Sequence, residues 1–484
     1  MNNENAEVAT RKSKRIHDQA PSEQFSNFMK TGWTPTDLTD LEPLEVVTYA
    51  YSRRQVLSAA FKGIRLVFPA GNFKVRANDT DYNYRPDSAY VYYSGVQGAD
   101  STADAVLVLE PSGDTHITYL YMNPRSTRDT DAFYRDAKYG ELWVGRRFTL
   151  AEAKARYQIE TRALSEIETL LGDGKETLTL RDIDLTIEKQ IKTHSREEEF
   201  AIFVSEQRFC KDEYELREMQ RAVDATALGF NDVIHAIPAA IETPRGERVL
   251  DGAFYGRARI LGNDLGYNTI IGAGSHACVL HWIRNDGDVR RGELVLVDAG
   301  VEMESFYTAD ITRTLPVDGK FTPAQRALYM LVYESQLAGF AAIKPGVLFS
   351  EINKACQEVL AKGLADMGVL TVSAEESMKP EVGLHRRWTL HGVSHHLGLD
   401  VHDCAQARRE IYRDSPLREG MVLTVEPGLY IQPDDELFAP EYRGIGIRIE
   451  DDVVVTADGC RNISENIPRH PDEIEKWMKG LLGR

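Results

Sequence analysis

The chain has 484 residues, and a length prior of about 100–200 residues per domain predicts two to four domains. Its net charge of −18 argues against a nucleic-acid groove, which needs a concentrated basic face. Five cysteines without CxxC spacing argue against a disulfide framework and against a thiolate zinc site.

The N-terminal stretch is polar and lacks the apolar run of a secretory signal. We therefore expect residues 1–30 to form a disordered tail. No stretch of the chain approaches the roughly 20 apolar residues of a membrane span. By elimination we expect a cytoplasmic protein with neither nucleic-acid nor membrane partners.

Residues 31–205 are predicted to form a mixed α/β domain. Apolar residues recur at helical spacing around residues 50–60. Short apolar runs that end at proline, glycine or serine predict buried strands at residues 64–68 and 90–93. The turn PSGD between residues 105–109 and 116–121 predicts a β-hairpin.

Residues 206–484 show a different pattern and are predicted to form a second domain. From residue 211, apolar residues at three- and four-residue steps predict one long amphipathic helix, which reaches at least Ile234. Thr322 followed by Pro323 predicts the start of a helix that runs to residue 344. A further helix is predicted from about residue 350 to a position before Gly368.

Four carboxylates stand at the ends of apolar runs in this second domain. Three of the runs end at a carboxylate, and a fourth begins with one, 12 residues after the first: Asp298, Glu426, Glu450 and Asp310. A carboxylate at a buried strand end is costly unless something compensates it. If all four share a pocket, protonation or two divalent cations could relieve their repulsion, and the cations match the charge better. The alternative is four unrelated acidic residues on separate strand ends.

The segment HGVSHHLGLDVHD holds four histidines, a third of the 12 in the chain: His391, His395, His396 and His402. A histidine cluster beside glycines indicates a functional site in irregular or strand conformation. The motif HExxH is absent, so a zincin helix is not supported. Oxygen-rich ligation with one imidazole suits Mn, Co, Fe or Zn.

Four segments together resemble the signature segments of a known family. They are VLVDAGVEMESFYTADITRTLPV, HGVSHHLGLDVHD, LTVEPGLYI and GIGIRIEDDVVVT. They resemble aminopeptidase P and prolidase, the proline-specific metallopeptidases of the pita-bread fold. The resemblance covers nearly all of residues 211–470 and extends more weakly to DYNYRPDSAYVYYSGV. It implies an α/β (α+β) protein in which a mixed α/β domain precedes a catalytic pita-bread domain.

The resemblance also implies roles for individual residues. Two divalent ions, Mn²⁺ before Co²⁺ or Zn²⁺, are expected on Asp298, Asp310, His395, Glu426 and Glu450. Asp310 and Glu450 should bridge both ions. The family's ligand lies four residues after the histidine of the His-Gly pair, which selects His395 over His396. Catalytic or substrate-lining roles are implied for Glu426 as general base, His281, His391 and His402, and substrate binding for Arg448 and Tyr430.

The activity implied is that of an Xaa-Pro aminopeptidase, which removes the first residue from peptides with proline second. Three alternatives stay open: a prolidase restricted to Xaa-Pro dipeptides, a metal-free creatinase-like hydrolase, and a non-catalytic binding protein on the same scaffold. Family members often self-associate, so we expect a homodimer or homotetramer.

Overall fold

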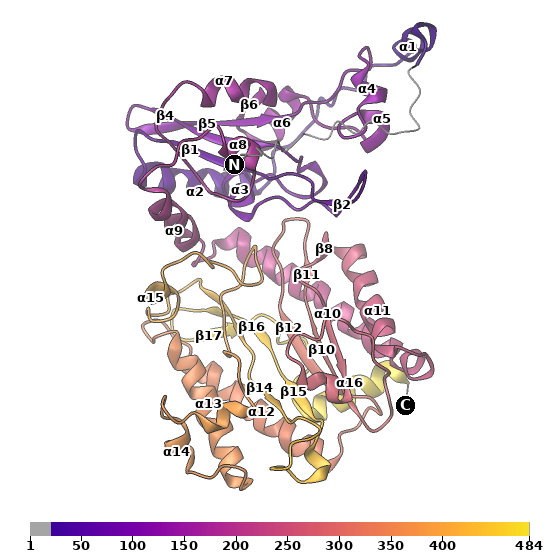
Figure 1. The fold of residues 1–484 in the computed structure, drawn as a ribbon, viewed down its shortest axis with the longest axis vertical. Helices are drawn as coiled ribbons and strands as arrows, with labels where there is room; N and C mark the ends of the chain where they lie inside the picture. The colour runs from indigo at the N-terminus through magenta and orange to yellow at the C-terminus, as the bar shows by residue number, and fades with distance from the viewer. Residues whose placement is uncertain (1–20, 484) are drawn as a thin grey trace, which may run out of the picture. The chain divides into compact units, whose positions relative to one another are not determined.

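The computed structural model describes residues 21–483. It divides into two compact units, one up to Glu197 and one from Glu198 (Figure 1). This division lies at the first residue of helix α9 (Glu197–Gln207), whereas the sequence suggested a boundary after residue 205. Residues 1–20 of the expected tail lie outside the described residues. The rest of that stretch contains a helix, α1 (Glu23–Met29), where disorder was expected, and the Ser22 hydroxyl accepts the Phe25 N–H at its start.

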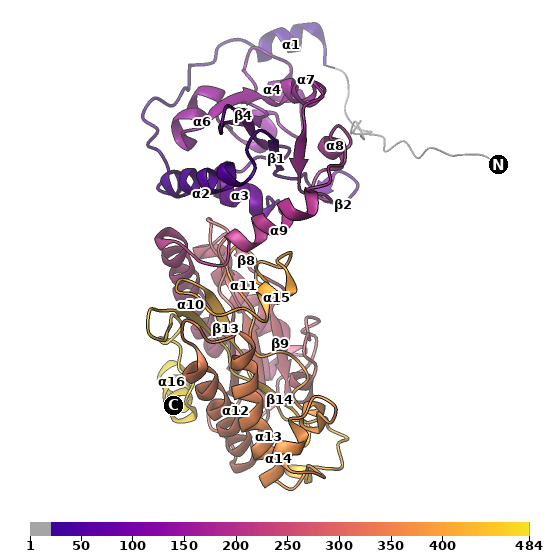
Figure 2. The same ribbon diagram turned by 90° about the vertical axis from the view of Figure 1, so that its left-hand side faces the viewer.

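The first unit is built around one five-stranded sheet with the strand order β6-β5-β4-β1-β7. The pairs β1/β7 and β5/β6 are parallel, and β1/β4 and β4/β5 are antiparallel. Helices α2 and α3 lie on one side of the sheet and α7 on the other, as both views show (Figure 1, Figure 2). The strands of this unit are β1 (Arg65–Pro69), β2 (Val75–Ala77), β3 (Thr80–Asp81), β4 (Val106–Ser112), β5 (Thr115–Met122), β6 (Glu160–Ala163) and β7 (Thr177–Thr179).

Alternating side chains explain how the sheet is covered. Val106 and Val108 of β4 point to one face, where they meet Ile167 and Leu171 of α7. The further helices of the unit, of which α2 is the longest, are α2 (Val46–Ala60), α3 (Ser88–Ser94), α4 (Ala132–Arg135), α5 (Glu141–Val144), α6 (Leu150–Tyr157), α7 (Ile167–Leu171) and α8 (Leu185–Glu188). The predicted helix around residues 50–60, the strand at 64–68 and the hairpin of β4 and β5 are confirmed.

The strand predicted at residues 90–93 is wrong, because this run belongs to helix α3. The Asp87 carboxylate accepts the N–H groups of Ala89 and Tyr90 and so caps the start of the helix. Gly95, in the left-handed region at φ 72°, ends it. All seven helical residues are buried, so the sequence shows an unbroken apolar run that periodicity alone cannot assign to a strand or a helix.

The second unit pairs helices around several small sheets. The predicted long helix is α10 (Glu213–Glu242), and the two later predictions match α12 (Pro323–Ala342) and α13 (Ser350–Asp366). Thr322 caps α12 through a capping box with Gln325, as its position before Pro323 predicted. The other helices are α11 (Gly246–Leu261), α14 (Ala374–Ser377), α15 (Arg409–Tyr412) and α16 (Pro471–Leu482).

The strands of the second unit lie between two helix pairs, α10 with α11 and α12 with α13 (Figure 1). The sheets have the orders β12-β10-β9, β13-β16-β17, β14-β15 and β11-β8. Their strands are β8 (Asp264–Leu265), β9 (Ile270–Ala273), β10 (Leu294–Ala299), β11 (Val301–Glu302), β12 (Ile311–Pro316), β13 (Val422–Val425), β14 (Gly428–Tyr430), β15 (Gly446–Arg448), β16 (Asp451–Val455) and β17 (Cys460–Asn462). None of the helices within residues 21–483 combines the length and apolar character needed to cross a bilayer.

Candidate metal centre

Asp298 and Asp310 lie on one face of the antiparallel pair β10/β12. Asp298 stands opposite Thr312, and Asp310 precedes Thr312 by two residues, so the period of two gives all three side chains the same face. Between them the chain turns back within residues 303–307, because Glu302 pairs with Thr308, and Gly300 lies against the returning segment. A Cβ at that position would lie 1.8 Å from the Ala309 carbonyl oxygen, so only glycine fits. The 12-residue interval thus returns both carboxylates to one place.

Glu426 and Glu450 come from a second antiparallel pair, β13/β16. Val425 pairs with Asp451, so one step further along the register Glu426 faces Glu450. Glu450 also forms an isolated bridge with Thr312, and its carboxylate accepts the Thr312 hydroxyl at 2.6 Å. This bridge joins the second ladder to the first and brings the carboxylates of both ladders to one site.

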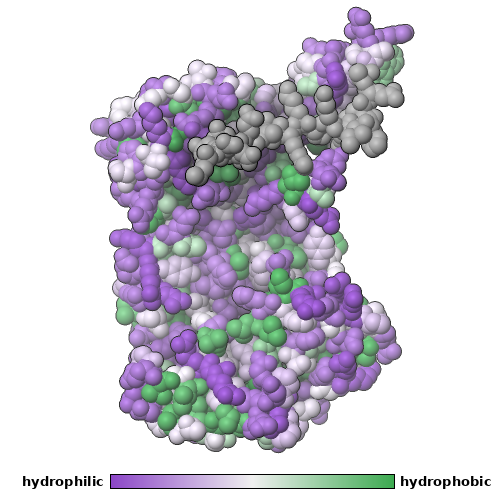
Figure 3. Space-filling model, viewed as in Figure 1, coloured by the Kyte–Doolittle hydropathy of each residue, from purple (hydrophilic) through white to green (hydrophobic). Residues whose placement is uncertain are grey.

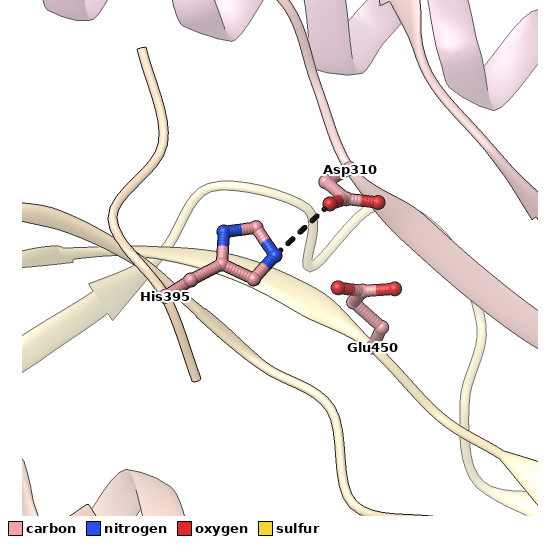
Figure 4. A group of neighbouring side chains, drawn as sticks. All are labelled: Asp310, His395 and Glu450. Carbon is pink, nitrogen blue, oxygen red and sulfur yellow. Dashed lines mark ion pairs between the residues drawn. The ribbon is translucent and has the colours of Figure 1, made fainter. Parts of the chain in front are cut away.

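His395 completes the group from the irregular segment that follows α14. The ligating atoms of Asp310, His395 and Glu450 all lie within 4.8 Å of one another (Figure 4). The Nε2 atom of His395 is 3.3 Å from Asp310 Oδ2 and 3.6 Å from Glu426 Oε1. Its Nδ1 atom lies 3.1 Å from the His396 carbonyl oxygen, which can only accept a hydrogen bond. Nδ1 therefore carries a proton, and Nε2 is the nitrogen that faces the carboxylates.

The carboxylates carry the electrostatic signature of crowded negative charge. Burial raises the pKa of Asp298, and Asp310 adds to the effect against the opposing charge of Arg448. Burial and Asp310 likewise raise the pKa of Glu450 well above its usual range. Burial raises the pKa of Glu426 to about 7, although His395 opposes it. These groups disfavour joint ionisation unless positive charge is supplied.

His395 responds in the opposite direction. Burial disfavours its imidazolium, but the carboxylates of Asp310 and Glu426 outweigh burial and raise the pKa to about 9. In the absence of a metal ion, a proton on His395 therefore supplies part of the missing positive charge. A cation bound at Nε2 would take the place of that proton.

The neighbouring His396 points elsewhere. It is 1% exposed, its ring stacks on Phe349 at 5.1 Å, and it meets Phe209 and Tyr412 edge-on at 4.5 Å and 4.7 Å. Burial lowers the pKa of His396 well below its usual range, so the ring is neutral. The structure thus separates the two adjacent histidines, one facing the carboxylates and one in an aromatic cluster.

Tyr267 is a member of the site that the sequence did not reveal. Its hydroxyl lies 2.7 Å from Asp298 Oδ1 and 2.5 Å from Asp310 Oδ1. Burial, with the charges of both aspartates, raises the pKa of this phenol well above its usual range, so it stays protonated and can donate. Tyr267 follows the two-residue strand β8, where no periodic pattern or motif marks it.

Arg448, Tyr430 and His391 form a hydrogen-bonded chain beside the carboxylates. Arg448 Nη2 contacts Asp298 Oδ2 at 2.5 Å, and Nη1 donates to the Tyr430 hydroxyl at 3.0 Å. That hydroxyl lies 2.7 Å from His391 Nε2, while His391 Nδ1 faces the Gly392 carbonyl oxygen at 2.8 Å. Burial and the charge of Arg448 lower the pKa of His391 to about 4. His391 is thus neutral, and its Nε2 atom accepts a hydrogen bond from the Tyr430 hydroxyl.

His281 and His402 lie at the exposed border of the group. The His402 ring packs edge-on against His395 with centroids 4.6 Å apart. Burial and the charge of His395 lower the pKa of His402. His281 also lowers the pKa values of His391 and His402, which puts its charge close to both. The predicted site residues therefore lie close together. His281 and His402 are exposed, whereas Arg448 and Tyr430, the predicted substrate-binding residues, are buried beside the carboxylates.

The donor set fits divalent cations. The carboxylates of Asp310, Glu426 and Glu450 gather around His395, and the Tyr267 hydroxyl joins Asp298 to Asp310. The raised pKa values of Asp298, Glu426 and Glu450 indicate that the positive charge of Arg448 and His395 does not balance the group. Hard or borderline cations accept oxygen ligands together with one imidazole. Tyr267 and Thr312 hold the carboxylates by hydrogen bonds, the support that metal ligands commonly have.

Comparison with known proteins agrees with this geometry. Residues 217–457 match the model of metallopeptidase family M24, and residues 49–179 match the aminopeptidase P N-terminal domain. A protein of Streptomyces coelicolor named Xaa-Pro aminopeptidase 1 is 49% identical over 96% of this chain and 93% of its own. The Escherichia coli Xaa-Pro aminopeptidase is 34% identical over 88% of this chain and 96% of its own.

Solved structures give the same result for the fold. A histidine-to-alanine variant of Escherichia coli aminopeptidase P superposes with a TM-score of 0.79 at 31% identity, covering 92% of this chain and all of the other. A zinc-substituted form of that enzyme in complex with product gives 0.76 and covers 92% of this chain and 99% of the other. The chain is thus a metallopeptidase of family M24 with an aminopeptidase P N-terminal domain. The predicted family and the predicted two-domain α/β fold are confirmed.

Proposed function

We propose that the metal centre hydrolyses the first peptide bond of peptides whose second residue is proline. The single observation that carries this is the convergence of four carboxylates and the His395 nitrogen on one site, in a chain whose relatives bear the name Xaa-Pro aminopeptidase over 96% of its length. With relatives of this identity and coverage, the prediction of a hydrolase with this activity is confirmed. What remains a proposal is the role of each residue.

The residues that would hold the two cations are Asp298, Asp310, His395, Glu426 and Glu450. Bound cations would lower the pKa of a water molecule and polarise the scissile carbonyl. Glu426, which lies 3.6 Å from His395 Nε2, is the residue proposed to take a proton from the attacking water and pass it to the leaving prolyl nitrogen. His281 and His402, which are exposed, are proposed to donate hydrogen bonds to the substrate carbonyl oxygen.

The substrate side combines apolar and polar surface. Apolar residues gather on the face of the second unit near β14 and β15 (Figure 3). Val279 and Ile283 flank His281 and are 45% and 50% exposed, and Leu390, next to His391, is 63% exposed. The proline ring has no N–H and a fixed φ, so a rigid wall that includes Tyr430 and His391 suits it. Peptides with proline second are therefore the proposed substrates.

A direct experiment compares two substrates after metal exchange. The purified protein is stripped with a chelator and reloaded separately with Mn²⁺, Co²⁺ and Zn²⁺, and each form is offered an Xaa-Pro-Xaa tripeptide and the matching Xaa-Pro dipeptide. We expect tripeptide hydrolysis that disappears on chelation and returns most fully with Mn²⁺. Cleavage of the dipeptide alone would establish the prolidase alternative. Undiminished cleavage after chelation would contradict the proposal that hydrolysis depends on a metal ion.

We further propose self-association and a cytoplasmic location. The first unit exposes apolar side chains on and near α1 and α5: Phe28, Trp33, Leu142, Trp143 and Val144. An exposed apolar group of this kind commonly marks a protein contact. Light scattering of the purified protein should give the mass of a dimer or tetramer, and a monomer would contradict the proposal.

A further inference from the structure

Glu247 is a buried carboxylate that the proposed reaction does not use. It lies in the first turn of α11 and is 0% exposed. Its Oε1 atom accepts the Ala273 N–H at 2.9 Å and His276 Nδ1 at 2.8 Å. Its Oε2 atom accepts Trp282 Nε1 at 2.8 Å and the Gly287 N–H at 2.6 Å. All four donors belong to one segment, residues 273–287.

This arrangement closes the segment at both ends. Ala273 ends strand β9 and Gly287 lies at the far side of the loop, so one carboxylate holds the two stems of residues 274–286 together. The fit is tight, because a Cβ on Gly287 would lie 2.4 Å from His276 Nδ1 and 2.8 Å from Glu247 Oε1. A buried carboxylate is tolerated only when such donors satisfy it, so the contacts are interdependent.

The two side-chain donors, His276 and Trp282, also restrict the part of the loop around His281. The rings of His276 and Trp282 stack with centroids 3.9 Å apart and planes at 25°. Leu280 and Trp282 pack on the apolar cluster that contains Cys278 and Tyr430. Leu280 is therefore held by packing, and Trp282 by packing, stacking and a hydrogen bond. The side chain of His281, between them, is exposed.

We propose that Glu247, His276 and Trp282 form a clasp that positions His281 for the substrate. None of them needs to touch the substrate, so they are positioning residues, and their effect on the reaction passes through His281. The inference rests on the proposed function, in which His281 contacts the substrate carbonyl.

The test begins with Glu247→Gln. The amide keeps the shape of the side chain, but its NH₂ group cannot accept a hydrogen bond, and in either orientation it faces two donors. We expect kcat/KM on an Xaa-Pro-Xaa tripeptide to fall about 10–100-fold, the usual effect of losing an outer partner of a site, with metal content unchanged. Hydrogen exchange of residues 274–287 should become faster in the variant.

The decisive measurement is a double-mutant cycle with His281→Ala. If the clasp acts through His281, Glu247→Gln costs much less in the His281→Ala background than in the wild type. An equal loss in both backgrounds would overturn the proposal, as would wild-type kinetics of Glu247→Gln. A wild type inactive on every Xaa-Pro peptide would instead refute the proposed function, so the two failures are distinguishable.

Two further variants guard against misfolding. Trp282→Phe keeps an aromatic ring that can stack on His276 but removes the indole N–H donor. The variant should fold and show a smaller loss, about 3–10-fold, that also vanishes in the His281→Ala background. Glu152→Gln in the first unit is the matched control, since Glu152 is a buried carboxylate that accepts the N–H groups of Leu38 and Thr149. This control should lose stability and keep kcat/KM, and a comparable loss of activity in the control would contradict the clasp.

Discussion

Two clusters of charged side chains, one in each unit, differ in how their charge is balanced. In the first unit Arg65 is 0% exposed and meets Glu110 and Asp173, each at 2.6 Å. The hydrogen bond from Arg65 lowers the pKa of Asp173 to about 2. In the second unit the carboxylates of Asp298 and Glu450 are buried close to other carboxylates, and their pKa values are raised.

The difference separates a completed cluster from an incomplete one. Around Arg65 the carboxylates of Glu110 and Asp173 face two cations, because Lys175 also contacts both. The charges of this cluster therefore balance without a ligand. At the candidate metal centre four carboxylates face one guanidinium and one imidazole, so the protein alone leaves an excess of negative charge. Such an excess persists in a folded protein when binding of a cation relieves it. Charge balance thus distinguishes a site for a ligand from a structural ion pair.

The largest expected effect comes from breaking the incomplete cluster. Asp310→Asn removes one charge and one ligand atom from the group that Asp310 forms with His395 and Glu450. We expect activity on an Xaa-Pro-Xaa tripeptide to fall by more than the roughly 10–100-fold typical of a lost outer partner, together with loss of bound metal. Elemental analysis and initial rates measure both.

The matched change in the completed cluster is Asp173→Asn. It should leave activity and metal content unchanged and lower the stability of the first unit by about 1.5–3 kcal/mol, the range for a hydrogen bond to a charged group. If Asp310→Asn kept full activity and the wild type bound no transition metal, the contrast between the two clusters would have no functional meaning.

Removal of the metal should lower the thermal stability of the protein through the candidate metal centre. A cation that binds only the folded protein stabilises it by about 2.7 kcal/mol at a hundredfold excess over Kd. We therefore expect a chelator to lower the Tm of the wild type and Mn²⁺ to restore it, with no response to Mn²⁺ in Asp310→Asn. Differential scanning calorimetry measures this shift, and an equal Mn²⁺ response in the variant would place the binding elsewhere.

A smaller effect is expected for Tyr267→Phe. The change removes one hydroxyl that contacts both Asp298 and Asp310. Loss of this support should weaken metal affinity and activity about 10-fold without unfolding the protein. Tyr329→Phe is the control, because that buried hydroxyl donates to the Arg469 carbonyl oxygen at 3.0 Å. If Tyr267→Phe and Tyr329→Phe had the same kcat/KM and metal affinity, Tyr267 would not support the carboxylates.

Much of this site was predictable because strand ends are visible in sequence. Apolar runs that end at Asp298 and Glu426 marked two strands, and these strands form the β10/β12 and β13/β16 pairs. The 12-residue interval from Asp298 to Asp310 matches the return of the chain in the first pair. The choice of His395 over His396 came from family resemblance, and the structure gives a physical reason: the two side chains diverge, one toward the carboxylates and one into the aromatic cluster.

Other features depend on contacts that no local pattern records. Tyr267 matters only because folding brings the end of β8 beside the hairpin of Asp298. The clasp residue Glu247 is separated from its four donors by 26 to 40 positions. The helix at Ser88–Ser94 was mistaken for a strand because a fully buried element shows no polar face. Contacts between residues far apart in sequence, and elements buried on all sides, are therefore the features that the sequence pattern could not predict.

The smallest expected effect sharpens the comparison by pH. Burial opposes ionisation of Glu152, but hydrogen bonds from Arg146 and from the N–H groups of Leu38 and Thr149 lower its pKa to about 2. In the unfolded chain a glutamate has a pKa of about 4.3, so the stabilisation is complete above that pH and is lost as the pH falls toward 2. Glu152→Gln should therefore be about 1 kcal/mol less stable than the wild type at pH 7, and the gap should narrow at pH 3. Urea unfolding followed at both pH values measures the gap. A constant gap would mean that Glu152 contributes by shape and not by charge, unlike the other paired carboxylates of the first unit.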